Sequence, residues 1–341
     1  EYIVSEAMHS LGVPTTRSLC AVETGENVYR EQILPGAVLT RVAKSHIRIG
    51  TFEYFASRGD LEGLKILADY AIDRHFSNLT DHEDKYLELI NAVAKNWSTL
   101  IAKWMSLGFI HGVMNTDNMS ICGETIDYGP CAFMDTFKAN QVYSFIDRQG
   151  RYAYNNQLNI GKWNLARFAS AILPLIHNDE NIAVEKTNHR LEQLYPLYDL
   201  EYKKIMLAKI GIIESDTHTF EVVNLWLEFL ERNKLDFTLS FHRLTQDPSY
   251  FDQYKDFHDI NKKRLSLITN KDLSLASMQG LNPYLIPRNH QIERVIQQGL
   301  KGNFDLFHQI NDALKDPWQP NQHFGLPPKA DEEIQNTFCG T

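Results

Sequence analysis

The sequence predicts an α+β fold in which a short mixed segment precedes a longer, mostly helical one. In residues 1–58 one stretch with helical periodicity is followed by short strand-like runs. From about residue 60, apolar residues recur at helical spacing in one segment after another. At 341 residues the chain is also long for a single compact core. We therefore expect a small α+β lobe over residues 1–58 and a large helical lobe over residues 59–330.

The first lobe should begin with a helix. Residues 1–11 place their apolar side chains on one helical face, and Gly12 should end the helix. The runs "RSLCAV" and "NVYREQIL" are typical of strands, and "ETGEN" between them predicts a hairpin connection. The run "AVLTRVA" predicts a third strand, so a helix and a small antiparallel sheet are expected here.

The second lobe should be built from helices with one interruption. Helical periodicity covers residues 61–76, 83–107, 162–176, 190–211, 219–233, 250–268 and 290–299. Residues 111–130 interrupt this pattern with a β-like stretch. The end of the chain, residues 331–341, is polar and follows a Pro pair, so we expect a mobile tail that carries Cys339.

Composition excludes several classes of partner. The net charge of −9 gives no electrostatic support for binding nucleic acid or an anionic membrane. No apolar run is long enough to cross a bilayer, and no charged-then-apolar stretch at the start of the given sequence, which begins at Glu1 and not at Met, argues for secretion. The four cysteines are too few and too scattered for a disulfide scaffold, which favours free thiols in a reducing compartment. We expect a soluble protein with neither nucleic acid nor membrane as partner.

The β-like stretch "HGVMNTDNMSICGETIDYGP" carries the candidate chemistry. The runs "MSIC" and "TIDY" flank Gly123-Glu124, which predicts a two-residue type II′ hairpin turn. In that register Asn118 and Asp127 lie near the open end of the hairpin. An amide oxygen and a carboxylate suit Mg²⁺ (or Mn²⁺) bound to substrate phosphates, and the adjacent Asp117 is free to act as a base. The alternative is that these residues only form turns and strand ends.

The spacing of these residues resembles that of protein kinases. His111 and Asn118 match the His and Asn of the kinase catalytic loop, and Asp127-Tyr128-Gly129 stands in place of Asp-Phe-Gly. The kinase catalytic aspartate is replaced by Val113, so Asp117 must serve if any residue does. This departure argues against an ordinary Ser/Thr kinase.

Longer motifs resemble one family. The stretches "GVPTTRSL", "RVAKSHIRIGTFEYF", "HGVMNTDNMSI", "TIDYGPCAFMD" and "GRYAYNNQ" are similar to those of the selenoprotein O (YdiU-like) family. The resemblance implies a bilobal protein-kinase-like fold and a protein adenylyltransferase, which moves AMP from ATP to Ser, Thr or Tyr hydroxyls of proteins. It also implies a bacterial cytoplasmic location, or a mitochondrial one in a eukaryote.

The same resemblance implies roles for individual residues. Asn118 and Asp127 would be the metal ligands and Asp117 the base. Arg41 and Arg48 match arginines that contact the nucleotide phosphates, and Arg suits phosphate oxygens because its donors form a planar fork. From the residues alone, either arginine could equally be a solvated or salt-bridged surface residue.

Two family features do not precede Glu1: a Gly-rich phosphate loop and a strand lysine. We therefore expect a fragment that lacks roughly the first quarter of the family's length. Residues 1–11 would be the helix whose glutamate pairs with that lysine, with Glu1 as the partner and Glu6 as the alternative.

Other readings remain open. A nucleotide-binding pseudokinase without transfer activity would explain Val113, although both metal ligands are present. A small-molecule phosphotransferase shares the His…Asn…Asp-x-Gly pattern. In the tail, Cys339 stands where the family carries a redox cysteine or selenocysteine that in some members bonds a loop cysteine. That loop position is Tyr143 here, so Cys131 is the nearest substitute partner, and the alternative is two free thiols.

Overall fold

The structure is a computed structural model that describes residues 1–29, 33–213 and 217–338. As predicted, it is α+β and dominated by helices. The α-helices are α1 (Tyr2–Ser10), α2 (Ile49–Ser57), α3 (Leu61–His75), α4 (Lys85–Ser106), α5 (Gln157–Ile176), α6 (Glu180–Lys209), α7 (Glu221–Arg232), α8 (Phe237–Gln246), α9 (Phe257–Ser266), α10 (Lys271–Leu281), α11 (Asn289–Gly299), α12 (Asp305–Leu314) and α13 (Gln322–Gly325). The strands are β1 (Arg17–Tyr29), β2 (Ile33–Val42), β3 (Phe109–Ile110) and β4 (Ala132–Phe133). The 3-10 turns are η1 (Ser77–Leu79), η2 (Thr116–Asn118), η3 (Tyr154–Asn156), η4 (Thr217–Phe220) and η5 (Pro248–Phe251).

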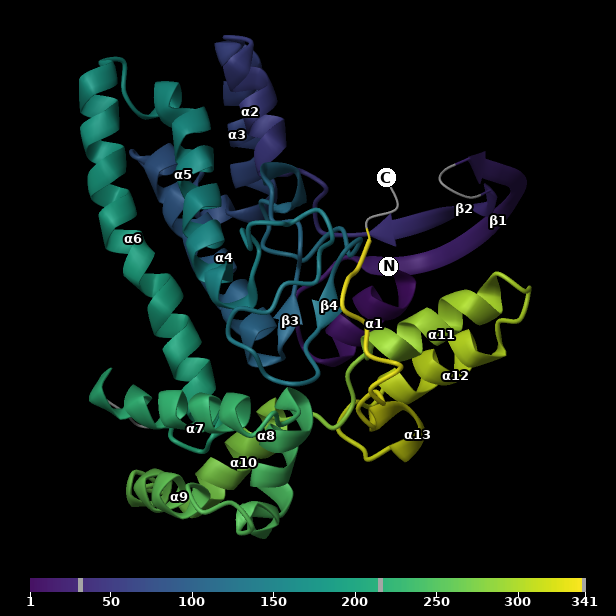
Figure 1. Cartoon of the computed structure of the whole chain (residues 1–341). Coiled ribbons are helices and arrows are strands. Elements are labelled where there is room, and N and C mark those ends of the chain that lie inside the picture. Colours follow the sequence, from purple (N-terminus) through teal and green to yellow (C-terminus); the bar gives the residue numbers. More distant parts are fainter. Residues whose placement is uncertain (30–32, 214–216, 339–341) are drawn as a thin grey trace.

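The first sheet is a long antiparallel pair, β1 and β2, which projects from the rest of the chain (Figure 1). The prediction of a hairpin turn at "ETGEN" was wrong, because these residues lie within β1. The register shifts between Glu23 and Asn27, so the segment forms a bulge, and Gly25 takes a φ of 75° there. The connection between the two strands, residues 30–32, lies outside the described residues.

The larger core surrounds α4. This helix packs against α5 and α6, and the three run side by side in Figure 1. Its apolar face includes Trp97 and Trp104, which are fully buried. Both indoles lie on the side of α4 that faces the β-like stretch, so α4 supports that stretch directly.

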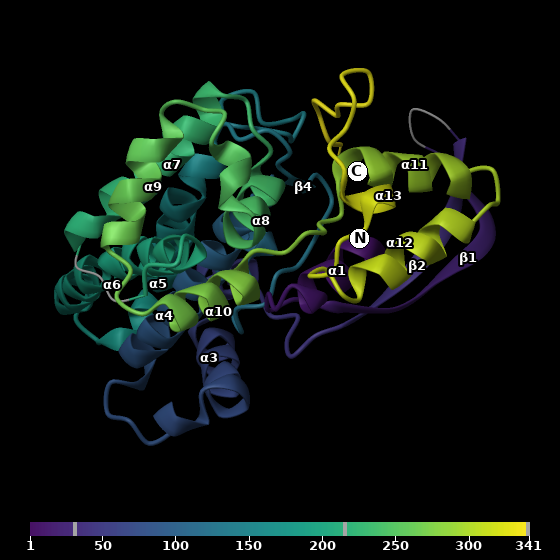
Figure 2. The ribbon, with the colours of Figure 1, turned by 90° about the horizontal axis from the view of Figure 1, so that it is seen from below.

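A second, smaller core joins the two ends of the chain. Ile3 and Ala7 of α1 are buried with residues of the C-terminal segment: Leu285, Val295, Ile310, Leu314 and Phe324. Figure 2 shows α1, α11, α12 and the β1–β2 pair gathered on one side, apart from α4 to α10. The helix that the sequence placed at the start of the small lobe is thus packed by helices from the other end of the chain, whereas α2 packs on α5. The division at residue 58 stays a prediction.

Within the described residues, the helices are all too short or too polar to span a bilayer.

Candidate functional site

The β-like stretch lies between β3 and β4, which pair antiparallel through Phe109 with Phe133 and Ile110 with Ala132. The predicted hairpin register was wrong. It placed Met119 opposite Tyr128, whereas Met119 pairs with Thr125 in an isolated bridge. The turn instead closes through the Gly123 amide, which donates to the Ser120 carbonyl at 3.1 Å. The carbonyl of Ser120 also accepts a hydrogen bond from α4.

That bond comes from a tryptophan that sequence reasoning did not single out. The indole N–H of Trp97 donates to the Ser120 carbonyl at 2.9 Å, and the indole N–H of Trp104 donates to Thr125 Oγ1 at 2.9 Å. Their spacing on one helix face is a core signal in the sequence. Only the three-dimensional structure reveals that their N–H groups fix both sides of the loop.

His111 holds the other end of the loop. Its ring is fully buried, and Nε2 lies 2.9 Å from the Ile126 carbonyl, immediately before Asp127. Burial lowers the pKa of this imidazole, so it is neutral at physiological pH and Nε2 donates the bond. His111 thus positions the backbone beside Asp127.

Asp127 has an unusual backbone conformation. Its φ is 65°, a left-handed value that only Lys234 shares among the described residues other than glycine. The next residue fixes the segment, because the Tyr128 hydroxyl forms a short buried hydrogen bond with Thr15 Oγ1. The side chain of Asp127 is half-buried and forms no hydrogen bond to any described residue, so its carboxylate is open to a ligand.

Asn118 and Asp117 lie on η2. The side-chain nitrogen of Asn118, Nδ2, donates to the Val113 carbonyl at 3.0 Å. The side-chain oxygen, Oδ1, has no partner in the described part of the chain. Asp117 is exposed and lies against Gly50 of α2, so closely that a Cβ atom on residue 50 would clash with Asp117 Oδ1. Asn118 Oδ1 and the Asp127 carboxylate are thus two hard oxygen donors without a partner among the described residues, the ligand type that a divalent cation prefers, and Asp117 directly precedes Asn118 in the chain.

The candidate cation ligands in this loop are one amide and one carboxylate side chain. Among the described residues, no group of three or more His, Cys, Asp or Glu side chains could hold a metal ion. A site with one amide and one carboxylate oxygen suits a cation that completes its shell with water and phosphate oxygens.

Arg48 lies directly before α2 and next to this loop. Its backbone forms an antiparallel bridge with Ser120, and its Nε is buried without a hydrogen-bond partner among the described residues. A buried, unpaired guanidinium nitrogen is costly and is the kind of donor that an anionic ligand satisfies.

Arg41 lies on β2 and pairs with the start of α1. Its Nε lies 3.4 Å from Glu1 Oε1, and Glu1 Oε2 accepts a hydrogen bond from the Tyr128 amide at 2.9 Å. Glu1 therefore links Arg41 to the segment that carries Asp127.

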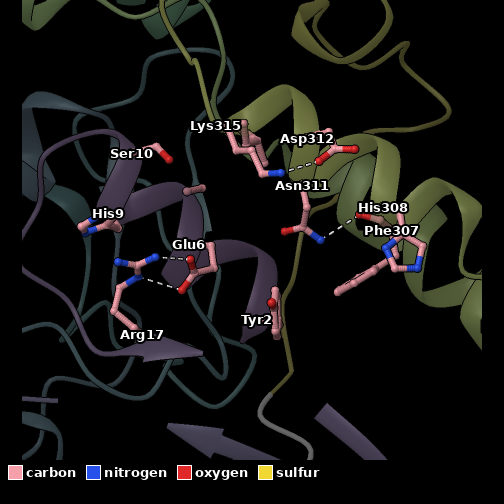
Figure 3. A pocket seen from close by; sticks show the side chains of 12 residues that line it. Tyr2, Glu6, His9, Ser10, Arg17, Phe307, His308, Asn311, Asp312 and Lys315 are labelled. Atoms are coloured by element: carbon pink, nitrogen blue, oxygen red, sulfur yellow. Dashed lines mark hydrogen bonds and ion pairs between the residues drawn. The ribbon is translucent and has the colours of Figure 1, made fainter. Parts of the chain in front are cut away.

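Glu6, the alternative to Glu1, points elsewhere. It accepts from Arg17 at 2.8 Å and 2.5 Å and from the Ser18 amide at 3.0 Å. Figure 3 shows this pair at the edge of a cavity of about 410 Å³ between α1 and α12. Among the described residues, Glu1 thus bonds the segment that carries Asp127, whereas Glu6 bonds Arg17 and Ser18.

The described end of the tail contacts the rest of the chain, and the mobility of residues 331–341 stays a prediction. The Thr337 amide donates to the Tyr143 carbonyl at 2.7 Å, the Phe145 amide donates to the Thr337 carbonyl at 3.0 Å, and Thr337 Oγ1 donates to the Pro130 carbonyl at 2.5 Å. The tail thereby adds to the 143–145 segment like a short strand.

Of the two cysteines in the predicted redox pair, Cys131 lies within the described residues. Cys339 lies outside the described residues, so its bond to Cys131 stays a prediction. Cys131 Sγ donates to the Tyr128 carbonyl at 3.2 Å, and burial raises the pKa of this thiol to about 12. Little reactive thiolate is therefore present at neutral pH.

Comparisons of the sequence with known proteins find a matching family and close relatives. A sequence model of the family described as "Protein adenylyltransferase SelO" matches residues 1–315. Proteins named "Protein nucleotidyltransferase YdiU" from Rhizobium etli, Nitrosococcus oceani and Alkaliphilus metalliredigens are each 45% identical to the chain. The alignments cover 100% of this chain and 72%, 71% and 72% of those relatives.

Proposed function

The chain belongs to the SelO family of protein adenylyltransferases, as its motifs predicted, and on that premise we propose that it transfers AMP from ATP to Ser, Thr or Tyr hydroxyls of proteins. The family makes it a nucleotidyltransferase. We also propose the bilobal, protein-kinase-like arrangement for the whole fold and a partner set of ATP and hydroxyl-bearing proteins.

The observation that carries the proposal is the open oxygen pair, Asn118 Oδ1 and the Asp127 carboxylate. These two residues would hold Mg²⁺ or Mn²⁺, which would neutralise phosphate charge when bound. The orientation of Asn118 supports this role, because its nitrogen is committed to the Val113 carbonyl and its oxygen is not.

The two arginines would contact the nucleotide phosphates. Arg48 offers a buried nitrogen without a partner among the described residues, and such a donor gains most from a charged acceptor. Arg41 pairs with Glu1 through Nε, which lies 3.4 Å from Glu1 Oε1. The two terminal nitrogens of its guanidinium would then donate to phosphate oxygens. Both act by positioning the triphosphate so that a hydroxyl meets the α-phosphorus.

Asp117 would take the proton of that hydroxyl. Its carboxylate is exposed, lies one residue before Asn118, and has no hydrogen-bond partner in the described part of the chain. Val113 cannot fill this role. The new bond would join the hydroxyl oxygen to the α-phosphorus, with pyrophosphate as the leaving group.

The decisive experiment uses ATP labelled at either the α- or the γ-phosphate, with Mg²⁺ and a mixture of acceptor proteins. We expect protein-bound label only from the α position. Label from the γ position would indicate a kinase, and nucleotide binding without any transfer would indicate a pseudokinase.

The base is tested separately by Asp117→Ala. We expect the transfer rate to fall by about 10²–10⁴ while nucleotide affinity is unchanged, because a base acts on the acceptor and not on the triphosphate. An affinity for ATP that falls in step with the rate would instead make Asp117 a metal ligand or a structural residue.

A further inference from the structure

We propose that Asn289, at the start of α11, is a positioning residue for the metal-binding segment. This role rests on the proposed function, because it concerns the geometry of Asp127. Asn289 is distant in sequence from the loop, yet its side chain contacts the strand that leaves it. The amide of Phe133 donates to Asn289 Oδ1 at 3.1 Å, and Asn289 Nδ2 donates to the Phe133 carbonyl at 2.8 Å.

These two bonds give β4 a partner on its outer edge. On its inner edge β4 pairs with β3, and the backbone groups of Phe133 point the other way, toward Asn289. A strand edge with unpaired amide and carbonyl groups is free to shift, and the side-chain amide of Asn289 supplies the donor and the acceptor that a third strand would supply.

β4, which Asn289 holds, and its partner β3 flank the loop that carries Asn118 and Asp127. β3 runs directly into His111, whose ring bonds the Ile126 carbonyl, and β4 follows Asp127 by a few residues. The Met134 amide also donates to the Gly108 carbonyl at 2.8 Å, which closes the pair beyond Phe133. A shift of β4 would therefore move Asp127 relative to Asn118.

Asn289 is itself held rigidly. The neighbouring Arg288 is fully buried and bonds Asp135, which follows β4, and Asp236, which precedes α8, the latter at 2.8 Å. Its Nε donates to the Gly325 carbonyl at 2.9 Å. The bonds of Arg288 therefore fix the backbone from which the Asn289 side chain reaches Phe133. Outer groups that hold a metal ligand in place are anchored in this way.

The test is the isosteric change Asn289→Asp. It keeps the acceptor for the Phe133 amide but replaces the donor by an oxygen that faces the Phe133 carbonyl. We expect the concentration of Mn²⁺ that half-saturates the ATP-bound protein, measured by electron paramagnetic resonance, to rise by about 10- to 100-fold. Transfer should need correspondingly more metal, and the rate at saturating metal should fall less.

The matched control is Asn233→Asp. Asn233 also donates through Nδ2 to a backbone carbonyl, that of Phe229, at 2.9 Å, but it lies at the end of α7. We expect its Mn²⁺ affinity to equal that of the wild type, even if its melting temperature falls as far as that of Asn289→Asp.

Equal Mn²⁺ affinity in both variants would overturn the role of Asn289. A variant that no longer folds would overturn it too, because Asn289 would then serve stability alone. A wild-type protein that binds no Mn²⁺ with ATP would instead refute the proposed function, so the two failures are distinguishable.

Discussion

At the scale of single residues, the candidate site depends on one residue with a strained backbone, Asp127, and on one glycine, Gly50. Asp127 has a φ of 65°, a conformation that costs on the order of 1–3 kcal/mol for residues other than glycine. It persists because His111 holds the preceding carbonyl and Glu1 holds the following amide. The strain orients the carboxylate, and the surroundings maintain it.

Gly50 contributes by having no side chain, which leaves room for the carboxylate of Asp117. We expect Gly50→Ala to lower the transfer rate by up to about a hundredfold, because the new methyl group would displace the Asp117 carboxylate by roughly an ångström. Stability should not fall, since the displaced group is a flexible side chain and alanine favours the helix by up to about 1 kcal/mol. Steady-state rates and thermal melts would check both expectations.

The control is Gly280→Ala in α10. Gly280 has no atom within 4 Å of an added Cβ, so the same substitution should raise stability and leave transfer unchanged. Equal rates for Gly50→Ala and the wild type would show that the contact between Gly50 and Asp117 has no part in the reaction.

Part of the candidate site could be proposed from the sequence because three of its residues are close together in the chain. Asp117, Asn118 and Asp127 lie within one short stretch, so their types and spacing suggested a metal-phosphate site. Gly50, Trp97 and Asn289 come from distant elements and look like ordinary helix residues in the sequence. Their roles arise from tertiary contacts that no local pattern encodes.

At the scale of elements, long helices with a continuous apolar face were predictable. α4 and α7 follow the expected ranges closely, whereas α2, α8, α10 and α12 were missed. α10 buries only Ser274 and Met278, so no apolar period marks it. The hairpin prediction at "ETGEN" failed because Gly25 can serve a bulge as well as a turn.

Two helix C-termini meet around a pair of buried cations. Lys209 ends α6 and donates through Nζ to the carbonyl of Leu281, the last residue of α10, at 3.0 Å. Arg264 of α9 donates to the Ile210 carbonyl, just past the end of α6, at 3.1 Å. No described carboxylate forms an ion pair with either cation, so the carbonyl ends of the helices supply the favourable partial charge.

Burial lowers the pKa of Lys209 from 10.5 to about 7, which makes stability depend on pH. Between these values the unfolded chain binds more protons than the folded one, so raising the pH favours folding. We expect this residue to add up to about 1.4 kcal/mol per pH unit to the free energy of unfolding across that window. Urea denaturation of the wild type and of Lys209→Met from pH 7 to 10 should show the steeper rise in the wild type. Parallel curves would refute a depressed pKa.

At the scale of the whole molecule, one arginine connects parts that are far apart in the sequence. Arg288 bonds Asp135 beyond β4, Asp236 at the start of α8, and the Gly325 carbonyl of α13. Asp236 in turn caps α8 by accepting from the Leu239 amide at 2.7 Å. The two cores, one around α4 and one around α1, therefore meet at a buried cation between two carboxylates.

This arrangement predicts a large, pH-dependent loss in Arg288→Leu. At pH 8 the variant leaves two buried carboxylates without their cation, and we expect a loss on the order of 3–5 kcal/mol in the free energy of unfolding. Burial already raises the pKa of Asp135 to about 6 in the wild type, and without Arg288 it should rise further. The folded variant then binds more protons than the unfolded chain below that pKa, so its stability should recover as the pH falls.

Urea denaturation at pH 8 and pH 5 measures this difference, with Arg232→Leu as the control. Arg232 pairs with Asp256 at 2.6 Å, but both side chains are more than half exposed, so its loss should stay below about 1 kcal/mol at either pH. A deficit of Arg288→Leu that is the same at both pH values would mean that Asp135 gains no proton when the guanidinium is removed. The two cores would then be joined by packing, and not by the charge of Arg288.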